Sequence, residues 1–245
     1  MKRNAQKGFT LIEIAIVLVI IGLLLGGVLK GQELITSARV RNLIAQQDGI
    51  KAAFFGFQDR FRAAPGDYAQ ATINITGVSG SSGCGQTSGV GNGNGNGNGR
   101  VEAAAGGLYE NILAWEHLSK AGFITGTYTC ATTETQTTSP VNPYGVYFQL
   151  VYDGVYGEGT AATPSPAKHN IKTGAQIPVE IITEVDRKVD DGAPNTGGFQ
   201  FSEYQGNAAA APARTGTDTC VTGTGASATW AATSGQTNCG GASLL

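Results

Sequence analysis

The feature that most constrains the fold of this chain is an apolar run near its N-terminus, from Phe9 to Leu29, whose only charged residue is Glu13. The run has 21 residues. A helix of that length spans about 31 Å, the thickness of the hydrocarbon core of a bilayer. The run is longer than the apolar part of a typical signal peptide, and no A-x-A cleavage site follows it. The sequence therefore predicts a membrane-spanning helix.

The charges that flank the run set its expected orientation. Lys2, Arg3 and Lys7 precede it, and Glu33 follows soon after. Because cytoplasmic flanks carry the excess of Lys and Arg, we expect the N-terminus in the cytoplasm and the C-terminus outside. A plain single-pass anchor would explain the run but not Glu13, since a carboxylate in a lipid-facing helix costs about 2.5–3.5 kcal/mol. We therefore expect Glu13 to have a partner.

The residues around the start of the run resemble a known processing signal. The stretch "KGFTLIE" (residues 7–13) follows a short basic leader and opens a hydrophobic helix, and it is similar to the signal of type IV pilins and type II secretion pseudopilins. The resemblance implies that prepilin peptidase cuts between Gly8 and Phe9 and methylates the new amino group of Phe9. It also implies that Glu13 meets the N-terminal amine of a neighbouring subunit during filament assembly. The physics agrees, because a buried acid is best neutralised by a cation at the same depth.

Beyond the membrane the helix is expected to continue as an amphipathic segment. A stripe of positions, apolar except for Gln47, recurs at alternating spacings of four and three, at Leu43, Gln47, Ile50, Phe54, Phe57 and Phe61. This stripe needs a cover, for which the β-sheet of the protein's own head is favoured over a coiled-coil partner. The expected fold is therefore α+β and pilin-like, with a long N-terminal helix packed on a small antiparallel β-sheet.

These segments define the predicted domain organisation. We expect a leader peptide over residues 1–8, a transmembrane helix half over 9–29, an amphipathic helix half over 30–62 and an exterior α+β head domain over 63–245. Pro65 disfavours helical geometry in the residue before it, so the sequence "APGDY" should end the long helix in a turn. Its acid, Asp67, is expected to cap that turn.

The composition favours a loop-rich exterior domain. The chain has 245 residues, of which 37 are glycine, and this indicates many turns around a modest core. Its formal net charge of −2 becomes −5 without the leader cations Lys2, Arg3 and Lys7, so nothing indicates a basic surface for nucleic acid. The chain has only two histidines and no G-x-S-x-G, H-E-x-x-H or P-loop motif. We therefore expect that it is not an enzyme.

Three further elements of the head are predicted from local patterns. "LYENILAWEHLSKAGFI" (residues 108–124) predicts a second helix, in which His117 is expected to pack or to face solvent. "YGVYFQLVYD" (144–153) alternates β-forming residues and predicts a strand. From Pro178 to Val189, an apolar spacing of four and a Glu–Lys pair favour a short helix, with a strand as the alternative.

A Gly/Asn-rich loop is expected over residues 77–99, ending in "GNGNGNGNG". Asn side chains and backbone carbonyls can bind calcium, but the EF-hand template does not fit. The closing acid of the template should fall at Ala103, and Glu102 misses that position by one. A flexible low-complexity loop is therefore favoured over a calcium loop.

An acidic segment near the end of the helix predicted at residues 178–189 is the second candidate for calcium. Its sequence "DDGAPNTGGF" resembles an Asp-Asp-Gly segment of pilin-like proteins. By that resemblance Asp186, Asp190 and Asp191 could converge on Ca²⁺, as acidic loops do in the major pseudopilins. The alternative is a solvated helix end turned by Gly192. No other cofactor is expected.

The four cysteines are expected to form two disulfides, because an even count outside the inner membrane favours oxidised pairs. Three connectivities are possible. Pairing of nearest neighbours, Cys84–Cys130 and Cys220–Cys239, is preferred, and the second pair would staple a C-terminal loop much as in pilins.

The resemblance implies a structural function, as a subunit of a type IV pilus or of a type II secretion pseudopilus. The expected partners are prepilin peptidase, copies of itself and other pilins or pseudopilins, and an inner-membrane assembly platform driven by a cytoplasmic ATPase. We expect a single-pass protein of the inner membrane with a periplasmic head, which then enters a filament. No direct nucleic-acid binding is indicated.

Two other classes stay open at this stage. One is a low-abundance minor pilin or adhesin-type binding module on the same anchor, although Glu13 favours a body subunit because the family's tip subunits more often lack this residue. The other is an exported enzyme on an ordinary anchor. Pilus, pseudopilus and DNA-uptake filament share the same N-terminal chemistry.

Overall fold

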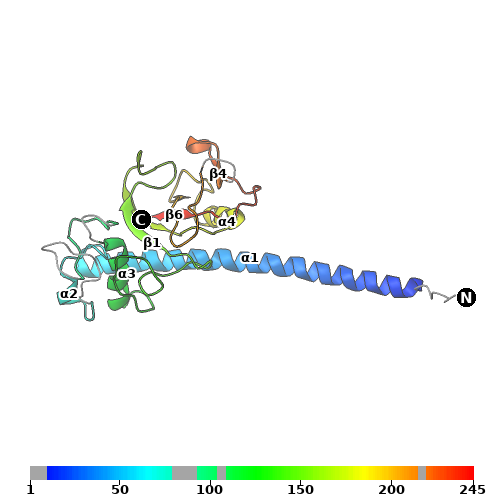
Figure 1. Ribbon diagram of the computed structural model, residues 1–245, viewed down its shortest axis with the longest axis horizontal. Helices are drawn as coiled ribbons and strands as arrows, with labels where there is room; N and C mark the ends of the chain where they lie inside the picture. Colours follow the sequence, from blue (N-terminus) through cyan, green and yellow to red (C-terminus); the bar gives the residue numbers. More distant parts are fainter. Residues whose placement is uncertain (1–9, 79–92, 104–108, 215–218) are drawn as a thin grey trace, which may run out of the picture. The chain divides into compact units, whose positions relative to one another are not determined.

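The computed structural model describes residues 10–78, 93–103, 109–214 and 219–245. The chain divides into two compact units, Met1–Arg39 and Val40–Leu245. The described part of the chain forms the helices α1 (Leu11–Phe61), α2 (Ala71–Asn74), α3 (Glu110–Lys120) and α4 (Val179–Val189), the short helix η2 (Gly225–Ser227), and the strands β1 (Gln149–Asp153), β2 (Lys168–Lys172), β3 (Phe199–Phe201), β4 (Val221–Thr222), β5 (Thr229–Trp230) and β6 (Gly241–Leu244), as the ribbon in Figure 1 shows.

Helix α1 has 51 residues, which confirms the predicted long N-terminal helix over its described length. Among the described residues, it is the one helix that is long and apolar enough to cross a membrane. None of the residues in its most apolar stretch is buried. Lys30 and Glu33 form an exposed ion pair of 2.7 Å just after this stretch.

The C-terminal part of α1 belongs to the second unit and carries the predicted amphipathic stripe. Its buried residues are Val40, Leu43, Gln47, Ile50, Ala53, Phe54 and Phe57. The ring of Phe54 lies 5.3 Å from the ring of His169 on β2. The sheet of the head therefore covers this stripe, as expected, and a coiled-coil partner is not needed for it.

The long helix ends where the sequence predicts. Arg62 adopts a left-handed backbone with φ of 56°, and Gly66 follows with φ of 90°. A Cβ atom at Gly66 would lie 2.3 Å from the carbonyl oxygen of Glu110. Only glycine fits this close approach between the turn and α3.

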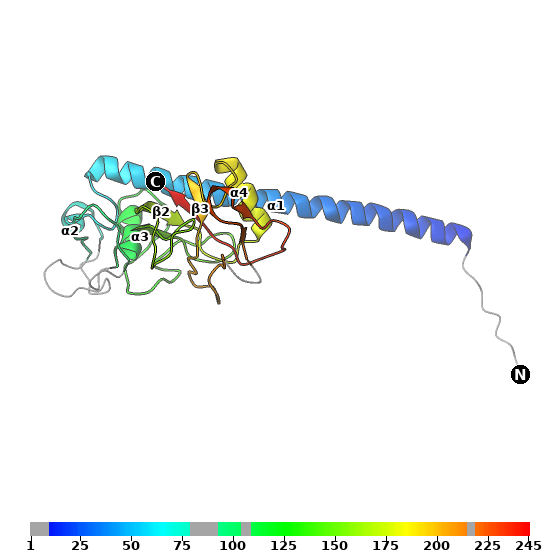
Figure 2. The same ribbon diagram turned by 90° about the horizontal axis from the view of Figure 1, so that it is seen from above.

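The main sheet has four strands in the order β1-β2-β6-β3, and every neighbouring pair is antiparallel. One of its two inner strands, β6, is the last element of the chain. Helix α3 contacts the sheet at β1 and α4 contacts it at β3, so the two helices lie at opposite ends of the sheet (Figure 2). Strands β4 and β5 form a separate two-stranded ladder. The α+β, pilin-like architecture is thus confirmed.

The local predictions in the head are mostly confirmed. Residues 179–189 are helical, and Glu184 and Lys188 pair at 2.8 Å, so the strand alternative was wrong for this segment. The strand predicted over residues 144–153 begins only at Gln149. Residues 144 and 145 belong to a turn, in which the side-chain oxygen of Asn142 accepts the N–H groups of Tyr144 and Val146, and Tyr147 makes only an isolated bridge to Val141.

The disulfide Cys220–Cys239 is present, which confirms the predicted C-terminal staple. Both cysteines are fully buried in the main hydrophobic core. The predicted pair Cys84–Cys130 involves Cys84, which lies outside the described residues, and it stays a prediction.

Candidate functional site

The predicted processing site lies at the end of the chain that the structure does not describe, since Gly8 and Phe9 fall among residues 1–9. The first described residue, Thr10, directly precedes helix α1. The carboxylate of Glu13 accepts hydrogen bonds from the N–H of Thr10 at 2.7 Å and from its hydroxyl at 2.8 Å. The amide of Glu13 donates to the Thr10 hydroxyl oxygen at 3.4 Å.

This arrangement is a capping box, in which Thr at the helix start and Glu three residues later satisfy free N–H groups. Sequence reasoning missed it, although the spacing Thr10-x-x-Glu13 was visible. Both bonds to Thr10 use one carboxylate oxygen, Oε2. The other oxygen, Oε1, makes no hydrogen bond to a described residue.

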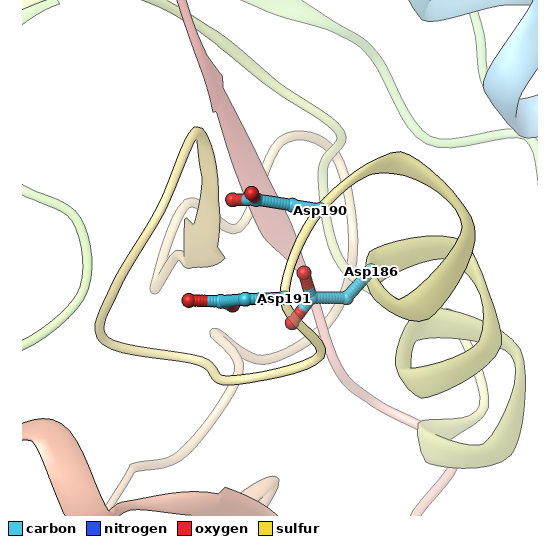
Figure 3. A group of neighbouring side chains, drawn as sticks. All are labelled: Asp186, Asp190 and Asp191. Carbon is cyan, nitrogen blue, oxygen red and sulfur yellow. The ribbon is translucent and has the colours of Figure 1, made fainter.

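The second candidate site is the acidic cluster at the C-terminal end of α4 (Figure 3). Asp186, Asp190 and Asp191 each offer an oxygen within 4.8 Å of the other two. Asp186 is fully buried; its Oδ2 accepts the indole N–H of Trp230 at 2.6 Å, and its Oδ1 has no hydrogen-bond partner. The structure thus brings together the three acids that the sequence singled out.

The two exposed acids of the cluster hold the turn that follows α4. Asp190 accepts the N–H of Phe199 at 3.1 Å and also that of Gly198. Asp191 accepts the N–H of Ala193 at 2.9 Å and the hydroxyl of Thr196. This turn therefore connects the end of α4 to the start of β3.

Electrostatics make this cluster favourable for a cation. The pKa of Asp186 is raised to about 7, mainly by burial and in addition by the charges of Asp191 and Asp190, while the hydrogen bond from Trp230 acts in the opposite direction. None of the ion pairs found between described residues includes these three carboxylates. Carboxylate oxygens are the ligands that Ca²⁺ prefers, and an unpartnered buried oxygen fits such a role.

A third polar site binds the end of the Gly/Asn-rich loop. Asp67 is buried, and its carboxylate accepts the N–H groups of Asn98 at 2.9 Å and Gly99 at 2.8 Å. Its carbonyl oxygen accepts the N–H of Gly97 at 3.0 Å. Residues 93–99 are thus held by hydrogen bonds, unlike the flexible segment that the sequence indicates, and residues 79–92 lie outside the described part.

Two residues of α3 complete this polar site. Buried Glu110 accepts the N–H groups of Asn96 at 2.9 Å and Glu102 at 3.0 Å, and burial raises its pKa to about 7. His117 is fully buried and lies within reach of Gly66 N–H (3.0 Å) and Gly93 O (2.9 Å). Burial lowers its pKa to about 4, so the neutral ring accepts through Nδ1 and donates through Nε2. His117 is therefore a packing residue, as expected, and its two hydrogen bonds connect the turn at Gly66 to the Gly/Asn-rich segment at Gly93.

Comparison with known proteins supports the interpretation of the N-terminus. Residues 3–29 match the prokaryotic N-terminal methylation motif, which is typical of type IV pilins and type II pseudopilins. No curated protein and no solved structure matches the chain. The prepilin-type signal implies a pilin or a pseudopilin, processed by prepilin peptidase and assembled with pilins.

The signal and the fold agree on the class of protein. The motif suggests a structural protein, and helix α1 packs on an antiparallel sheet in a pilin-like architecture. The membrane-capable helix and the motif together indicate membrane anchoring followed by entry into a filament.

Proposed function

We propose that this protein is a structural subunit in the body of a type IV pilus or a type II secretion pseudopilus. The observation that carries the proposal is the methylation motif over residues 3–29, followed by helix α1 with a single acid, Glu13, in its apolar part. Cleavage between Gly8 and Phe9 releases the basic leader, and methylation leaves the amino group of Phe9 cationic. The basic leader favours a cytoplasmic N-terminus and an exterior head.

The proposed assembly step pairs Glu13 with the Phe9 amine of a neighbouring subunit. Support comes from the carboxylate of Glu13, whose Oε2 accepts both hydrogen bonds from Thr10, while its Oε1 has no hydrogen-bond partner among the described residues. In lipid, an ammonium at the same depth offsets the cost of this charge. The pairing sets the register of one apolar helix against the next in the filament core.

The test compares Glu13→Gln with the wild type in cells that express prepilin peptidase. The amide oxygen of Gln still accepts the N–H of Thr10, so the helix cap is kept while the charge is lost. We expect normal loss of residues 1–8 and one methyl group on Phe9 by intact mass. We expect at least about tenfold less protein in sheared filaments, because removing one partner of a buried charge pair is strongly destabilising.

The matched control is Glu33→Gln in the same helix, where the acid forms an exposed ion pair with Lys30. This variant should assemble as the wild type does. Normal filaments from Glu13→Gln contradict the pairing, and an uncut Met1 terminus in the wild type contradicts the proposal as a whole. The share of the protein in purified filaments distinguishes a body subunit from a minor one.

We further propose that Asp186, Asp190 and Asp191 hold Ca²⁺ in the head. Three acids converge there, and the buried Oδ1 of Asp186 has no hydrogen-bond partner. Calcium takes six to eight oxygen ligands, so backbone carbonyls and water would complete the shell. The ion would neutralise the cluster and stabilise the turn after α4.

A further inference from the structure

The segment 93–99 contains Asn-Gly pairs, which are chemically labile. Asn is among the thermolabile residues of proteins, and it loses its side-chain amide most readily when glycine follows. Because glycine has no Cβ atom, its backbone nitrogen can reach the Asn side chain without steric hindrance. The structure describes three complete pairs, Asn94-Gly95, Asn96-Gly97 and Asn98-Gly99. The lifetime of these amides therefore depends on how the fold holds them.

Loss of the amide needs only water as a co-reactant. The backbone nitrogen of the glycine gives up its proton and attacks Cγ of the preceding Asn, which forms an N–Cγ bond and closes a succinimide ring. The Cγ–Nδ2 bond breaks, and the amide takes up a proton and leaves as ammonia. Water then opens the ring at one of its two carbonyl groups, and the product is aspartate or isoaspartate. The reaction therefore requires a glycine N–H that is free and an Asn side chain that can turn towards it.

In the folded head, the glycine N–H groups of all three pairs donate hydrogen bonds. Gly95 donates to the carbonyl oxygen of Tyr68 at 3.1 Å, and Gly97 donates to that of Asp67 at 3.0 Å. Gly99 donates to the carboxylate of Asp67 at 2.8 Å. An N–H in such a bond must give up its acceptor before its nitrogen can attack, which costs free energy. Asp67 therefore protects two of the three pairs.

The Asn side chains of these pairs are held as well. The side-chain oxygen of Asn94 accepts the N–H of Thr72 at 2.9 Å and its hydroxyl at 3.1 Å. The Nδ2 atoms of Asn96 and Asn98 both donate to Oε2 of Glu102, at 3.2 and 3.0 Å. An amide that is bonded in this way cannot turn towards the glycine nitrogen without losing its partner. Glu102 therefore adds a second restraint on Asn96 and Asn98.

Asn96 and Asn98 also lie where a new negative charge is unfavourable. The pKa values of Asp67 and Glu110 are raised mainly by burial and in addition by the charge of Glu102. Conversion of either Asn to an acid removes a donor to Glu102 and brings a further carboxylate against it, and like charges at this distance repel. The product therefore cannot rebuild the hydrogen bond that held the amide.

We propose that the segment 93–99 is a one-way chemical switch. While the head is folded, Asp67 and Glu102 keep the amides of Asn96 and Asn98 intact. When this polar site opens, the freed amides convert to aspartate or isoaspartate, and the added charge prevents the segment from returning to its place. The modification belongs to the head alone and does not depend on filament assembly.

The first test measures conversion in the full-length mature chain in micelles, at one pH and temperature. Mass spectrometry of the tryptic peptide 63–100 locates each converted Asn, and isoaspartyl methyltransferase detects isoaspartate. In the folded wild type, Asn96 and Asn98 should convert at least about tenfold more slowly than in the same protein in denaturant. Asp67→Asn and Glu102→Ala should each raise the rate in the folded protein about tenfold, the effect of losing a hydrogen bond to a charged group.

The matched control is Glu203→Ala, at an exposed acid away from the segment, which should convert as the wild type does. Circular dichroism shows whether each variant folds, and Glu102→Ala, at a half-exposed residue, decides if Asp67→Asn does not fold. Equal rates in the folded and the denatured wild type overturn the proposal. So do unchanged or slower rates in the folded variants.

The second test concerns the added charge. Asn98→Asp installs the product, whereas Asn98→Ala removes the same donor to Glu102 without a charge. Conversion of Asn96 should be at least about threefold faster in Asn98→Asp than in Asn98→Ala, roughly the effect of one like-charge contact at a partly exposed site. Equal conversion of Asn96 in the two variants overturns the one-way character of the switch.

Discussion

At the scale of single residues, the head depends on buried polar side chains that bind backbone groups far away in the sequence. Asp67, Glu110 and His117 together hold the turn at Gly66 and the Gly/Asn-rich segment 93–99. The repeat is compatible with this role because a Cβ atom at Gly95 would lie 2.2 Å from the carbonyl oxygen of Gly66. The alternating glycines therefore allow the segment to approach these side chains.

Glu110 gives this polar site a pH dependence. Its pKa is raised from 4.5 to about 7, mainly by burial and in part by the nearby carboxylates of Asp67 and Glu102. A raised pKa in the folded state means that the folded protein binds a proton more tightly than the unfolded chain. The contribution of Glu110 is then fully present below about pH 4.5 and is lost as the pH rises to about 7.

We predict that Glu110→Gln removes this pH dependence. The free energy of unfolding of the wild type relative to the variant should fall as the pH rises from 4.5 to 7. Thermal denaturation of both proteins across this range measures the difference. Glu203→Gln, at an exposed acid, serves as the control. A constant difference between wild type and Glu110→Gln would show that this carboxyl does not titrate in the window.

At the scale of elements, α1 is one continuous helix whose two parts lie in different environments. Its N-terminal part exposes apolar side chains, whereas its C-terminal part buries them in the head. Phe57 is the centre of the second environment, since its ring lies 4.6 Å from Phe61 and 6.0 Å from both His117 and Phe123. The aromatic cluster therefore joins α1, α3 and the loop after α3.

We predict that Phe57→Ala destabilises the head by about 3–5 kcal/mol, the usual cost of removing a buried aromatic side chain. Phe55→Ala is the matched control two residues away, because Phe55 is 49% exposed, and it should cost under about 1 kcal/mol. Chemical denaturation of the full chain in micelles, followed by tryptophan fluorescence, measures both. Equal losses in the two variants would contradict the assigned orientation of α1 in the head.

At the scale of the whole molecule, the stability of the head depends on its last residues. Strand β6 (Gly241–Leu244) lies between β2 and β3, and the disulfide Cys220–Cys239 fixes the segment just before it. The acidic cluster adds a third connection, because Asp186 on α4 binds Trp230 on β5 and Asp190 binds Phe199 on β3. An ion at this cluster would stabilise several elements at once.

We predict that Ca²⁺ raises the thermal denaturation midpoint of the head and that EDTA lowers it again. At a Ca²⁺ concentration of about 100 Kd the gain is about 2.7 kcal/mol. Asp191→Asn should abolish the shift while it keeps an acceptor for the N–H of Ala193. Asp48→Asn, at an exposed acid on α1, should keep the shift. A midpoint that does not respond to Ca²⁺ would exclude the site.

Much of the fold was predictable because its signals are local. The apolar run, the stripe on α1 and the helix at residues 179–189 each depend on residues within a few positions of one another. The capping box at Thr10 and Glu13 has the same local origin and was only overlooked. The pair Cys220–Cys239 was preferred among three connectivities and is present.

By itself, the sequence determined the membrane-capable helix, its processing signal and its amphipathic continuation, because side chains three and four residues apart decide those features. Only the tertiary structure decided that Asp67 and Glu110 bind the Gly/Asn-rich segment and that β6 pairs with β2 and β3. These contacts join residues far apart in the chain. They form because burial of the core offsets the entropic cost of closing long loops, and because buried polar groups need hydrogen-bond partners. Neither condition leaves a periodic pattern in the sequence.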